Sequence, residues 1–158
     1  MKKENNLRWA GLSLFVLLMD GLSKYEVTQT FTLGQAKAMG PYLNLVFVYN
    51  RGTAFGLLSH SAVWAYWFLT VLALVVSVAI VVGLYQLPRN ENWQGCGLAF
   101  VLGGALGNVW DRLTLGRVID FIDFHIQSWH FATFNVADAA ITVGAVMLLW
   151  KIVRGKVM

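Results

Sequence analysis

The sequence predicts a membrane protein that is mainly α-helical, a bundle of four transmembrane helices with a small extracytoplasmic β-sheet. Of its 158 residues 58% are hydrophobic and only 13% are charged, and the mean hydropathy is +0.60. A soluble fold of this size has too little interior for so much apolar surface. Long apolar stretches recur along the chain, and basic residues gather at its ends. The length favours a single domain over residues 1–158.

Four segments have roughly the 20 mostly apolar residues that a membrane span needs. The second is the clearest, because no charged residue occurs from Gly52 to Pro88. The third is short, and its Gly103, Gly104 and Gly107 would let a neighbouring backbone approach closely. The predicted spans are residues 7–27, 62–87, 94–110 and 135–150.

The basic residues predict the orientation of these spans. Because basic residues beside apolar spans stay in the cytoplasm, both termini are expected inside and the number of spans is even. The connections at residues 27–61 and 111–134 then lie on the outer face. Residues 7–27 resemble a cleavable export signal, but no A-x-A-like site ends the run and further spans follow, so this segment is expected to remain. The basic residues on which this orientation rests are Lys2, Lys3, Arg8, Arg89, Lys151, Arg154 and Lys156.

The first outer connection contains a predicted strand. In "YLNLVFVYN", residues 43, 45, 47 and 49 alternate with residues 44, 46, 48 and 50, which is the periodicity of a strand. We expect a small sheet that lies on the membrane beside the helices. Asn50 follows in "YNRGTAFG", where Gly52 and Gly56 permit tight turns beside which a substrate chain could lie.

Two aspartates lie in apolar segments at the predicted edge of the membrane, where a charged carboxylate is costly to keep. If "RVIDFIDFH" is extended, Asp120 shares a face with Val118, Ile122 and Phe124 and has apolar neighbours. Asp138 opens the last span, where it has a structural alternative. Asn135 could cap the helix through its side-chain oxygen, and Asp138, three positions further on, could accept a hydrogen bond from a backbone amide at the helix start.

Both acids fall at the outer membrane boundary, so they can meet. Two neighbouring carboxylates in a medium of low dielectric constant share one proton and titrate as a unit. The ionised member can take a proton from water while the protonated member polarises a carbonyl group. Asp120 and Asp138 are therefore candidates for the cleavage of a peptide bond.

Other charged residues lie within or beside the spans. Asp20 and Lys24 are one helical turn apart, either as a mutually neutralising pair or with a direct role toward substrate. Asp111 and Arg112 are expected to form a charged bracket at the end of the third span. Arg112 could instead orient an aspartate or a substrate carbonyl with its planar donors.

The sequence favours neither a metal nor a nucleic-acid site. It has no H-E-x-x-H or C-x-x-C motif, and the lone Cys96 excludes an intramolecular disulfide framework. His60, His125 and His130 match no familiar metal spacing and are expected at the interface without a catalytic part. No metal, cofactor or nucleic acid is expected. The predicted interface anchors are Trp64, Trp67, Trp110, Trp129 and Trp150.

Taken together, five short motifs resemble a known family, the lipoprotein signal peptidases or signal peptidase II. They occur in the family's order between Asp20 and about Ile141. They are "DGLSK" for D-x-x-S/T-K, "NRGTAFG" for N-x-G-x-A-F-G, "GGALGNVWDR" for the glycine-rich G-N-x-x-D-R block, "GRVIDF" for G-x-V-x-D-F and "FNVADAAI" for F-N-x-A-D-x-x-I.

The resemblance implies an aspartic intramembrane endopeptidase of the bacterial cytoplasmic (inner) membrane. Such enzymes cut the signal peptide from a prolipoprotein just before a diacylglyceryl-modified cysteine, and the cyclic peptide globomycin inhibits them. By motif position Asp120 and Asp138 form the catalytic pair, and the choice of Asp120 over Asp123 rests partly on this resemblance. The residues that would line or brace the site are Asn50, Gly104, Asn108, Arg112, Asn135 and Ala137, with Asp20 and Lys24 in support.

Three positions depart from the commonest family pattern. Gly21 stands where glutamine is frequent, Ala132 where proline is frequent and Ala139 where serine often follows the second acid. None of these replaces a carboxylate, so they bear on loop shape and substrate preference.

Two other function classes compete with the peptidase. Intramembrane acids and bases often mark ion routes, which favours a small proton-coupled transporter. A transporter would more naturally hold its acids near the membrane centre, often in related half-repeats, and the sequence shows neither feature. A non-catalytic assembly factor would leave the clustering of acids at one face unexplained.

Overall fold

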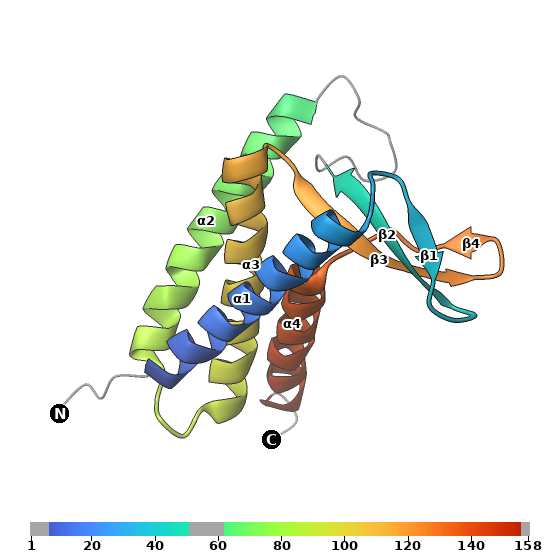
Figure 1. Cartoon of the computed structure of the whole chain (residues 1–158). Coiled ribbons are helices and arrows are strands. Elements are labelled where there is room, and N and C mark those ends of the chain that lie inside the picture. Colours follow the sequence, from blue (N-terminus) through green and yellow to red (C-terminus); the bar gives the residue numbers. More distant parts are fainter. Residues whose placement is uncertain (1–6, 51–61, 156–158) are drawn as a thin grey trace.

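The computed structural model describes residues 7–50 and 62–155. In this part of the chain four long helices form a bundle, and a four-stranded antiparallel sheet extends from one end of it (Figure 1). The mainly helical fold with a small sheet agrees with the prediction. The predicted turn residues Gly52 and Gly56 and the side chain of His60 lie outside the described residues. The helices are α1 (Leu7–Thr30), α2 (Ala62–Gln86), α3 (Asn92–Leu115) and α4 (Val136–Gly155).

Each helix covers one predicted span, and three of the four run further than predicted. By length and hydropathy two of the described helices could cross a membrane, at Val63–Gln86 and Val136–Gly155. The polar residues within α1 and α3 lower their hydropathy. The count of four spans therefore stays a prediction.

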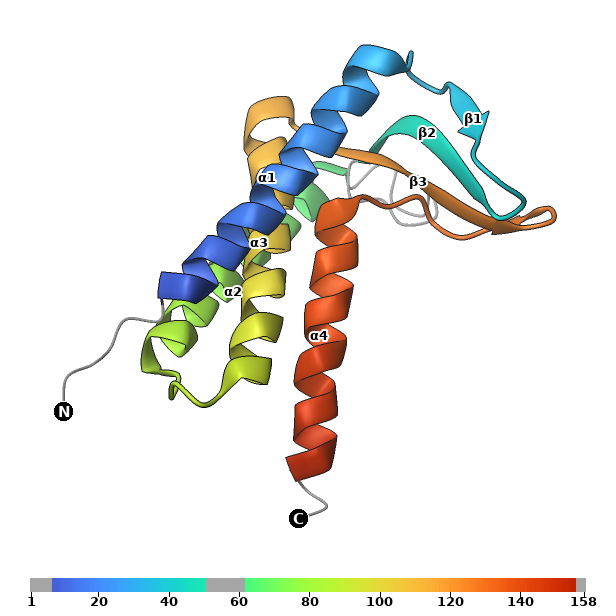
Figure 2. The same ribbon diagram turned by 60° about the horizontal axis from the view of Figure 1, so that its bottom comes forward.

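Helix α3 packs against each of the other three helices (Figure 2). Its glycines allow the close approach predicted for them. A Cβ atom at Gly103 would lie 2.6 Å from the carbonyl oxygen of Ser13 on α1, and one at Gly104 would lie 2.4 Å from that of Ala137 on α4. Because real Cβ atoms do not come so near a backbone, glycine is needed at both positions.

The sheet contains both predicted strands. Strands β2 and β3 pair antiparallel with a register shift between Leu45 and Val48, and Val48 lies opposite Asp120. Such a shift bends a strand and increases its local twist. The order is β1 (Ala36–Ala38), β2 (Leu43–Asn50), β3 (Val118–Ile126) and β4 (Trp129–His130).

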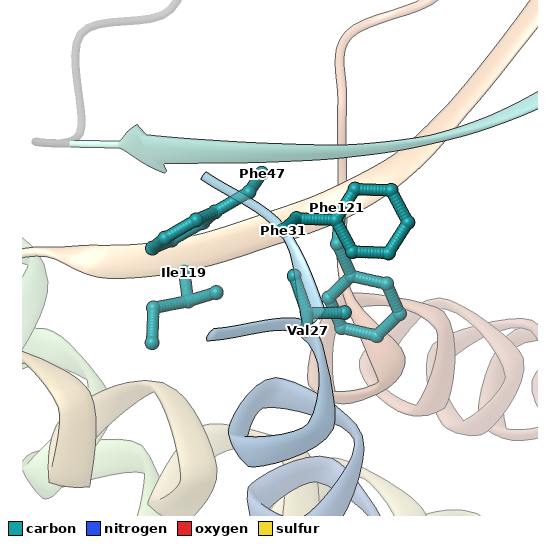
Figure 3. Close-up of a cluster of buried hydrophobic side chains, with 5 residues drawn as sticks. All are labelled: Val27, Phe31, Phe47, Ile119 and Phe121. Carbon is teal, nitrogen blue, oxygen red and sulfur yellow. The ribbon is translucent and has the colours of Figure 1, made fainter. Parts of the chain in front are cut away.

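A buried hydrophobic cluster joins the sheet to the end of α1 (Figure 3). Val27 and Phe31 come from α1 and its C-terminal connection, Phe47 from β2, and Ile119 and Phe121 from β3. Successive side chains of a strand point to opposite faces. Asp120, between Ile119 and Phe121, is therefore turned away from this cluster.

The opposite end of the bundle is rich in basic residues. There the start of α1, the α2–α3 connection and the end of α4 come together (Figures 1 and 2). The guanidinium group of Arg8 donates hydrogen bonds to the carbonyl oxygen of Arg89 and to the side chain of Asn92, each at 2.8 Å. Lys151 forms an ion pair with Glu91.

Candidate active site

The structure brings Asp120 and Asp138 together through one asparagine. Asp120 lies on β3 with 1% of its surface exposed, and Asp138 lies partly buried in the first turn of α4. Asn135 Nδ2 donates a hydrogen bond to Asp120 Oδ1 at 2.7 Å, and Asn135 Oδ1 accepts one from the backbone amide of Asp138 at 2.9 Å. Asn135 therefore contacts both acids.

The capping interaction considered for Asp138 is present. The Asp138 amide donates to the Asn135 side chain, and the Asn135 amide donates to Asp138 Oδ2 at 3.3 Å. This reciprocal pair is a capping box, which satisfies otherwise unpaired amides at a helix start. The second oxygen, Asp138 Oδ1, accepts a hydrogen bond at 2.7 Å from Asn108 Nδ2. The carboxylate thus serves both the helix cap and the polar site.

The environment of Asp120 favours its protonated form. Burial raises the pKa of Asp120 from 3.8 to about 6, and the negative charge of Asp138 acts in the same direction. Hydrogen bonds from Asn50 Nδ2 to Asp120 Oδ2, at 2.9 Å, and from Asn135 oppose this rise. Because burial outweighs these bonds, Asp120 keeps its proton to a higher pH than an ordinary aspartate.

Asn108 connects this pair to charges on α1. Its Oδ1 accepts hydrogen bonds from Asn135 Nδ2 at 3.2 Å and from Lys24 Nζ at 3.4 Å. With its oxygen so engaged, the amide nitrogen faces Asp138. The side chain of Asn108 is therefore oriented by its neighbours on both sides.

Lys24 lies between two carboxylates. Its Nζ is 2.6 Å from Asp20 Oδ2 and 2.9 Å from Asp111 Oδ2. The pairing of Asp20 with Lys24 was expected. Asp111 was expected to form a charged bracket with Arg112. The charges of these two residues do interact, and Asp111 in addition forms an ion pair with Lys24. Adjacent residues on a helix point in different directions, so Asp111 faces α1.

The other predicted site residues lie around this network. Gly104 and Ala137 form the close contact between α3 and α4, and Ala137 is 0% exposed. Arg112 is partly buried at the end of α3, and its charge interacts with those of Asp138, Asp111 and Asp120. Gly104 and Ala137 thus set the packing of α3 against the start of α4, and Arg112 places a cation near the carboxylates.

Asp123 belongs to a separate cluster on the sheet. It accepts hydrogen bonds at 2.9 Å from Asn44 Nδ2 and from His130 Nδ1. Burial alone would raise the pKa of Asp123, but these two hydrogen bonds favour the charged carboxylate and lower the pKa below its ordinary value. The ring of His125 stacks on that of His130 at 5.1 Å. The structure therefore separates Asp123 from the pair around Asn135.

Sequence reasoning missed three polar contacts. The bonds of Asn44 and His130 to Asp123 require the registers of β2 with β3 and of β3 with β4, which no short motif reveals. Tyr66 of α2 donates a hydrogen bond at 2.5 Å to the carbonyl oxygen of Arg112. A tyrosine in an apolar span, whose hydroxyl group needs a partner, was the available signal for that contact.

The chemistry of the site is that of an acid–base pair. Among the described residues, no group of three or more His, Cys, Asp or Glu side chains could hold a metal ion. Both carboxylates accept N–H donors on both oxygens, and burial raises the pKa of Asp120 to about 6. Two neighbouring carboxylates of which one has a raised pKa can act as an acid–base pair, one accepting a proton while the other donates one.

Comparison with known proteins identifies the family. Residues 12–154 match the model of the family described as signal peptidase (SPase) II. A lipoprotein signal peptidase of Burkholderia cenocepacia (strain HI2424) is 48% identical over 146 residues, which are 92% of this chain and 87% of that protein. One of Hydrogenovibrio crunogenus (strain DSM 25203 / XCL-2) is 47% identical over 138 residues, 87% of this chain and 80% of that protein.

A solved structure agrees with these matches. It is a bacterial membrane enzyme with 26% sequence identity and a TM-score of 0.82, and the match covers 94% of this chain and 89% of that one. The resemblance seen in the sequence motifs is thereby confirmed. The chain belongs to the signal peptidase II family.

Proposed function

We propose that this protein is an aspartic endopeptidase that removes the signal peptide from diacylglyceryl-modified bacterial prolipoproteins. The cut falls just before the lipidated cysteine. Membership of the signal peptidase II family supports this activity. The observation that carries the aspartic mechanism is that Asn135 bonds to both Asp120 and Asp138 within a buried polar network.

The two acids have different roles in the proposed reaction. Asp138, whose two oxygens accept N–H donors at the start of α4, acts as the base. It takes a proton from water as the water oxygen attacks the carbonyl carbon. Asp120, which keeps its proton, donates it to the carbonyl oxygen.

The tetrahedral intermediate then collapses. Asp138 gives its proton to the leaving nitrogen, the carbon–nitrogen bond breaks, and the hydroxyl proton returns to Asp120. The pair thus regains its starting state without a metal or cofactor. The Arg112 guanidinium is placed to orient a substrate carbonyl through its planar donors.

The position of the site in the membrane follows from the distribution of charge. All four helices are proposed to span the inner membrane, because the charges within α1 and α3 are paired inside the bundle. The basic end, with Arg8, Arg89 and Lys151, faces the cytoplasm, as do both termini. The carboxylates and the sheet then lie near the outer face.

This placement matches the proposed substrate. Acyl chains confine a diacylglyceryl-modified protein to the plane of the membrane lipid, so its scissile bond arrives at a fixed depth. Such positioning replaces a search in three dimensions and lowers the barrier through proximity. A globomycin-type peptide inhibitor is expected to bind at the same site.

The proposal is tested by cleavage of a diacylglyceryl-modified prolipoprotein in reconstituted membranes. We expect Asp120→Asn and Asp138→Asn each to lower turnover by about 1,000-fold, the range seen when acid–base groups are lost. Asp123→Asn is the matched control, since it changes a carboxylate on the same strand outside the pair. Near-normal turnover by either of the first two variants would remove that residue from the mechanism.

Metal removal gives an independent test of the mechanism. We expect the rate of cleavage to be unchanged after dialysis against EDTA, because protein side chains supply both proton transfers. Loss of activity that zinc restores would overturn the metal-free reaction.

A further inference from the structure

The two carboxylates that bind Lys24 also hold the backbone next to the catalytic acids. Asp20 Oδ1 accepts a hydrogen bond at 2.9 Å from the amide of Ala137, the residue before Asp138. Asp111 Oδ2 accepts one at 3.1 Å from the amide of Ile119, the residue before Asp120. One ammonium group therefore joins two carboxylates, each of which fixes the chain beside one acid.

A third contact runs directly to a catalytic side chain. Lys24 Nζ donates to Asn108 Oδ1 at 3.4 Å, and Asn108 Nδ2 donates to Asp138 Oδ1 at 2.7 Å. The three protons of the ammonium group thus have three acceptors. Each of the three acceptors in turn bonds either to Asp138 itself or to the backbone amide of the residue before Asp120 or Asp138.

Burial makes this cluster stiff. The side chains of Lys24, Asp20 and Asp111 are 3%, 1% and 7% exposed. Ion pairs removed from water are screened little. The backbone of α3 leaves room for the cluster, because a Cβ atom at Gly107 would lie 2.6 Å from Asp20 Oδ2. The catalytic carboxylates come from two elements, α4 and β3, and the cluster ties both to α1 and α3.

From this arrangement we infer that Lys24 is a positioning residue that sets the separation of Asp120 and Asp138 through Asp20, Asp111 and Asn108. The inference rests on the proposed function, since it assigns a role in that reaction. The described contacts of Lys24 are with Asp20, Asp111 and Asn108, and none of them is with the carboxyl groups of Asp120 or Asp138. Its effect is therefore on turnover more than on substrate binding.

The first test is Lys24→Met, which keeps the length of the side chain and removes its charge. We expect kcat to fall by about 100-fold, the effect of a misplacement near 1 Å, while KM stays within about threefold. Lys151→Met is the matched control, because Lys151 is also paired with a carboxylate but lies at the basic end. Unchanged kcat in Lys24→Met would overturn the inference.

A second variant separates positioning from the cost of burying charge. Lys24 with Asp20 and Asp111 carries one net negative charge, and Lys24→Met alone leaves two uncompensated carboxylates. The double variant Asp20→Asn/Lys24→Met keeps the native net charge while the ammonium link is lost. We expect it to match the native melting temperature more closely than Lys24→Met, yet to keep the low kcat. A double variant with native kcat would contradict the positioning role.

The pH profile supplies a readout that a purely structural role would not move. Burial and the negative charge of Asp138 on α4 raise the pKa of Asp120, and the positive charge of Lys24 lowers it. The charge of Arg112 on α3 also interacts with that of Asp120. In Lys24→Met the limb of kcat/KM near pH 6 should move to higher pH. An unshifted limb would count against the inference. Cleavage by the native protein that is lost in Asp120→Asn verifies the proposed function separately, and an inactive native protein would overturn both.

Discussion

At the scale of single residues, the site depends on asparagines that orient carboxylates. Asn50, Asn108 and Asn135 each donate a side-chain N–H to Asp120 or Asp138. An amide donor holds a carboxylate without adding a charge. The acids are therefore held in place by neutral donors, and burial is the main cause of the raised pKa of Asp120.

The raised pKa of Asp120 predicts how activity depends on pH. Asp120 must be protonated to act as the acid, and its pKa in the free enzyme is about 6. We expect kcat/KM to fall as the pH rises through that value, because the acid is then lost. The measurement is a pH profile of the cleavage of a lipid-modified precursor, with Asp123→Asn as a control that keeps the same limb. A native profile that stayed flat well above this pH would show that Asp120 does not supply the proton.

At the scale of elements, the close contact between α3 and α4 sets the position of Asp138. The Cβ atom of an alanine at Gly104 would lie 2.4 Å from the Ala137 carbonyl oxygen and 2.9 Å from Ile141 Cγ1. A backbone atom cannot move aside as a flexible side chain can, so α4 itself must shift. The first turn of α4, which holds the capping box, would shift with it.

We therefore expect Gly104→Ala to lower both the melting temperature and kcat, the latter by about 100-fold. Gly11→Ala is the matched control on α1, where nothing lies within 4 Å of the added Cβ. Alanine favours a helix over glycine by roughly 1 kcal/mol, so this control should be neutral or stabilising. Thermal unfolding in detergent and cleavage assays measure the two effects. Equal behaviour of the two variants would show that the helices can separate without cost.

At the scale of the whole molecule, charge is divided between the two ends. Basic side chains gather where α1 begins and α4 ends, and the proposed catalytic acids lie beside the sheet at the other end. Since basic residues beside membrane spans stay in the cytoplasm, this division predicts an orientation. The orientation that we propose also places α1 and α3, with their internal charges, across the bilayer.

Cysteine labelling tests this topology in a variant that lacks Cys96. In intact spheroplasts, we expect a membrane-impermeant maleimide to label Tyr42→Cys and Ser128→Cys, which replace exposed residues of the sheet end. Lys3→Cys and Asn90→Cys should be labelled only after the membrane is opened. Labelling of Asn90→Cys and Ser128→Cys from the same side would show that α3 does not cross.

Much of the fold could be predicted because local patterns determine it. The alternation at residues 43–50 gave β2 with the observed bounds. The third span was predicted to end at residue 110, but α3 continues to Leu115. Gly116 ends it with φ of 70°, a conformation that glycine adopts easily. The charges at residues 111 and 112 had suggested the membrane boundary, whereas Asp111 is neutralised by Lys24.

The site was predictable in its members and less so in its connections. Asn135 and Asp138 are three positions apart, so a capping box could be foreseen from the sequence alone. The bond from Ile119 to Asp111 joins α3 to β3, and the bond from Ala137 to Asp20 joins α4 to α1. Such contacts depend on how helices and strands pack, and no periodicity within one segment encodes them.

The full engagement of Asn135 has a consequence for drug resistance. Its amide nitrogen contacts Asp120, Asn108 and the Ile119 carbonyl oxygen, and its oxygen accepts the Asp138 amide. In the proposed mechanism, a bacterium that altered this asparagine to escape a compound bound at the two acids would also inactivate its own enzyme. Escape would then have to arise from residues farther from the two acids, or from making more of the protein.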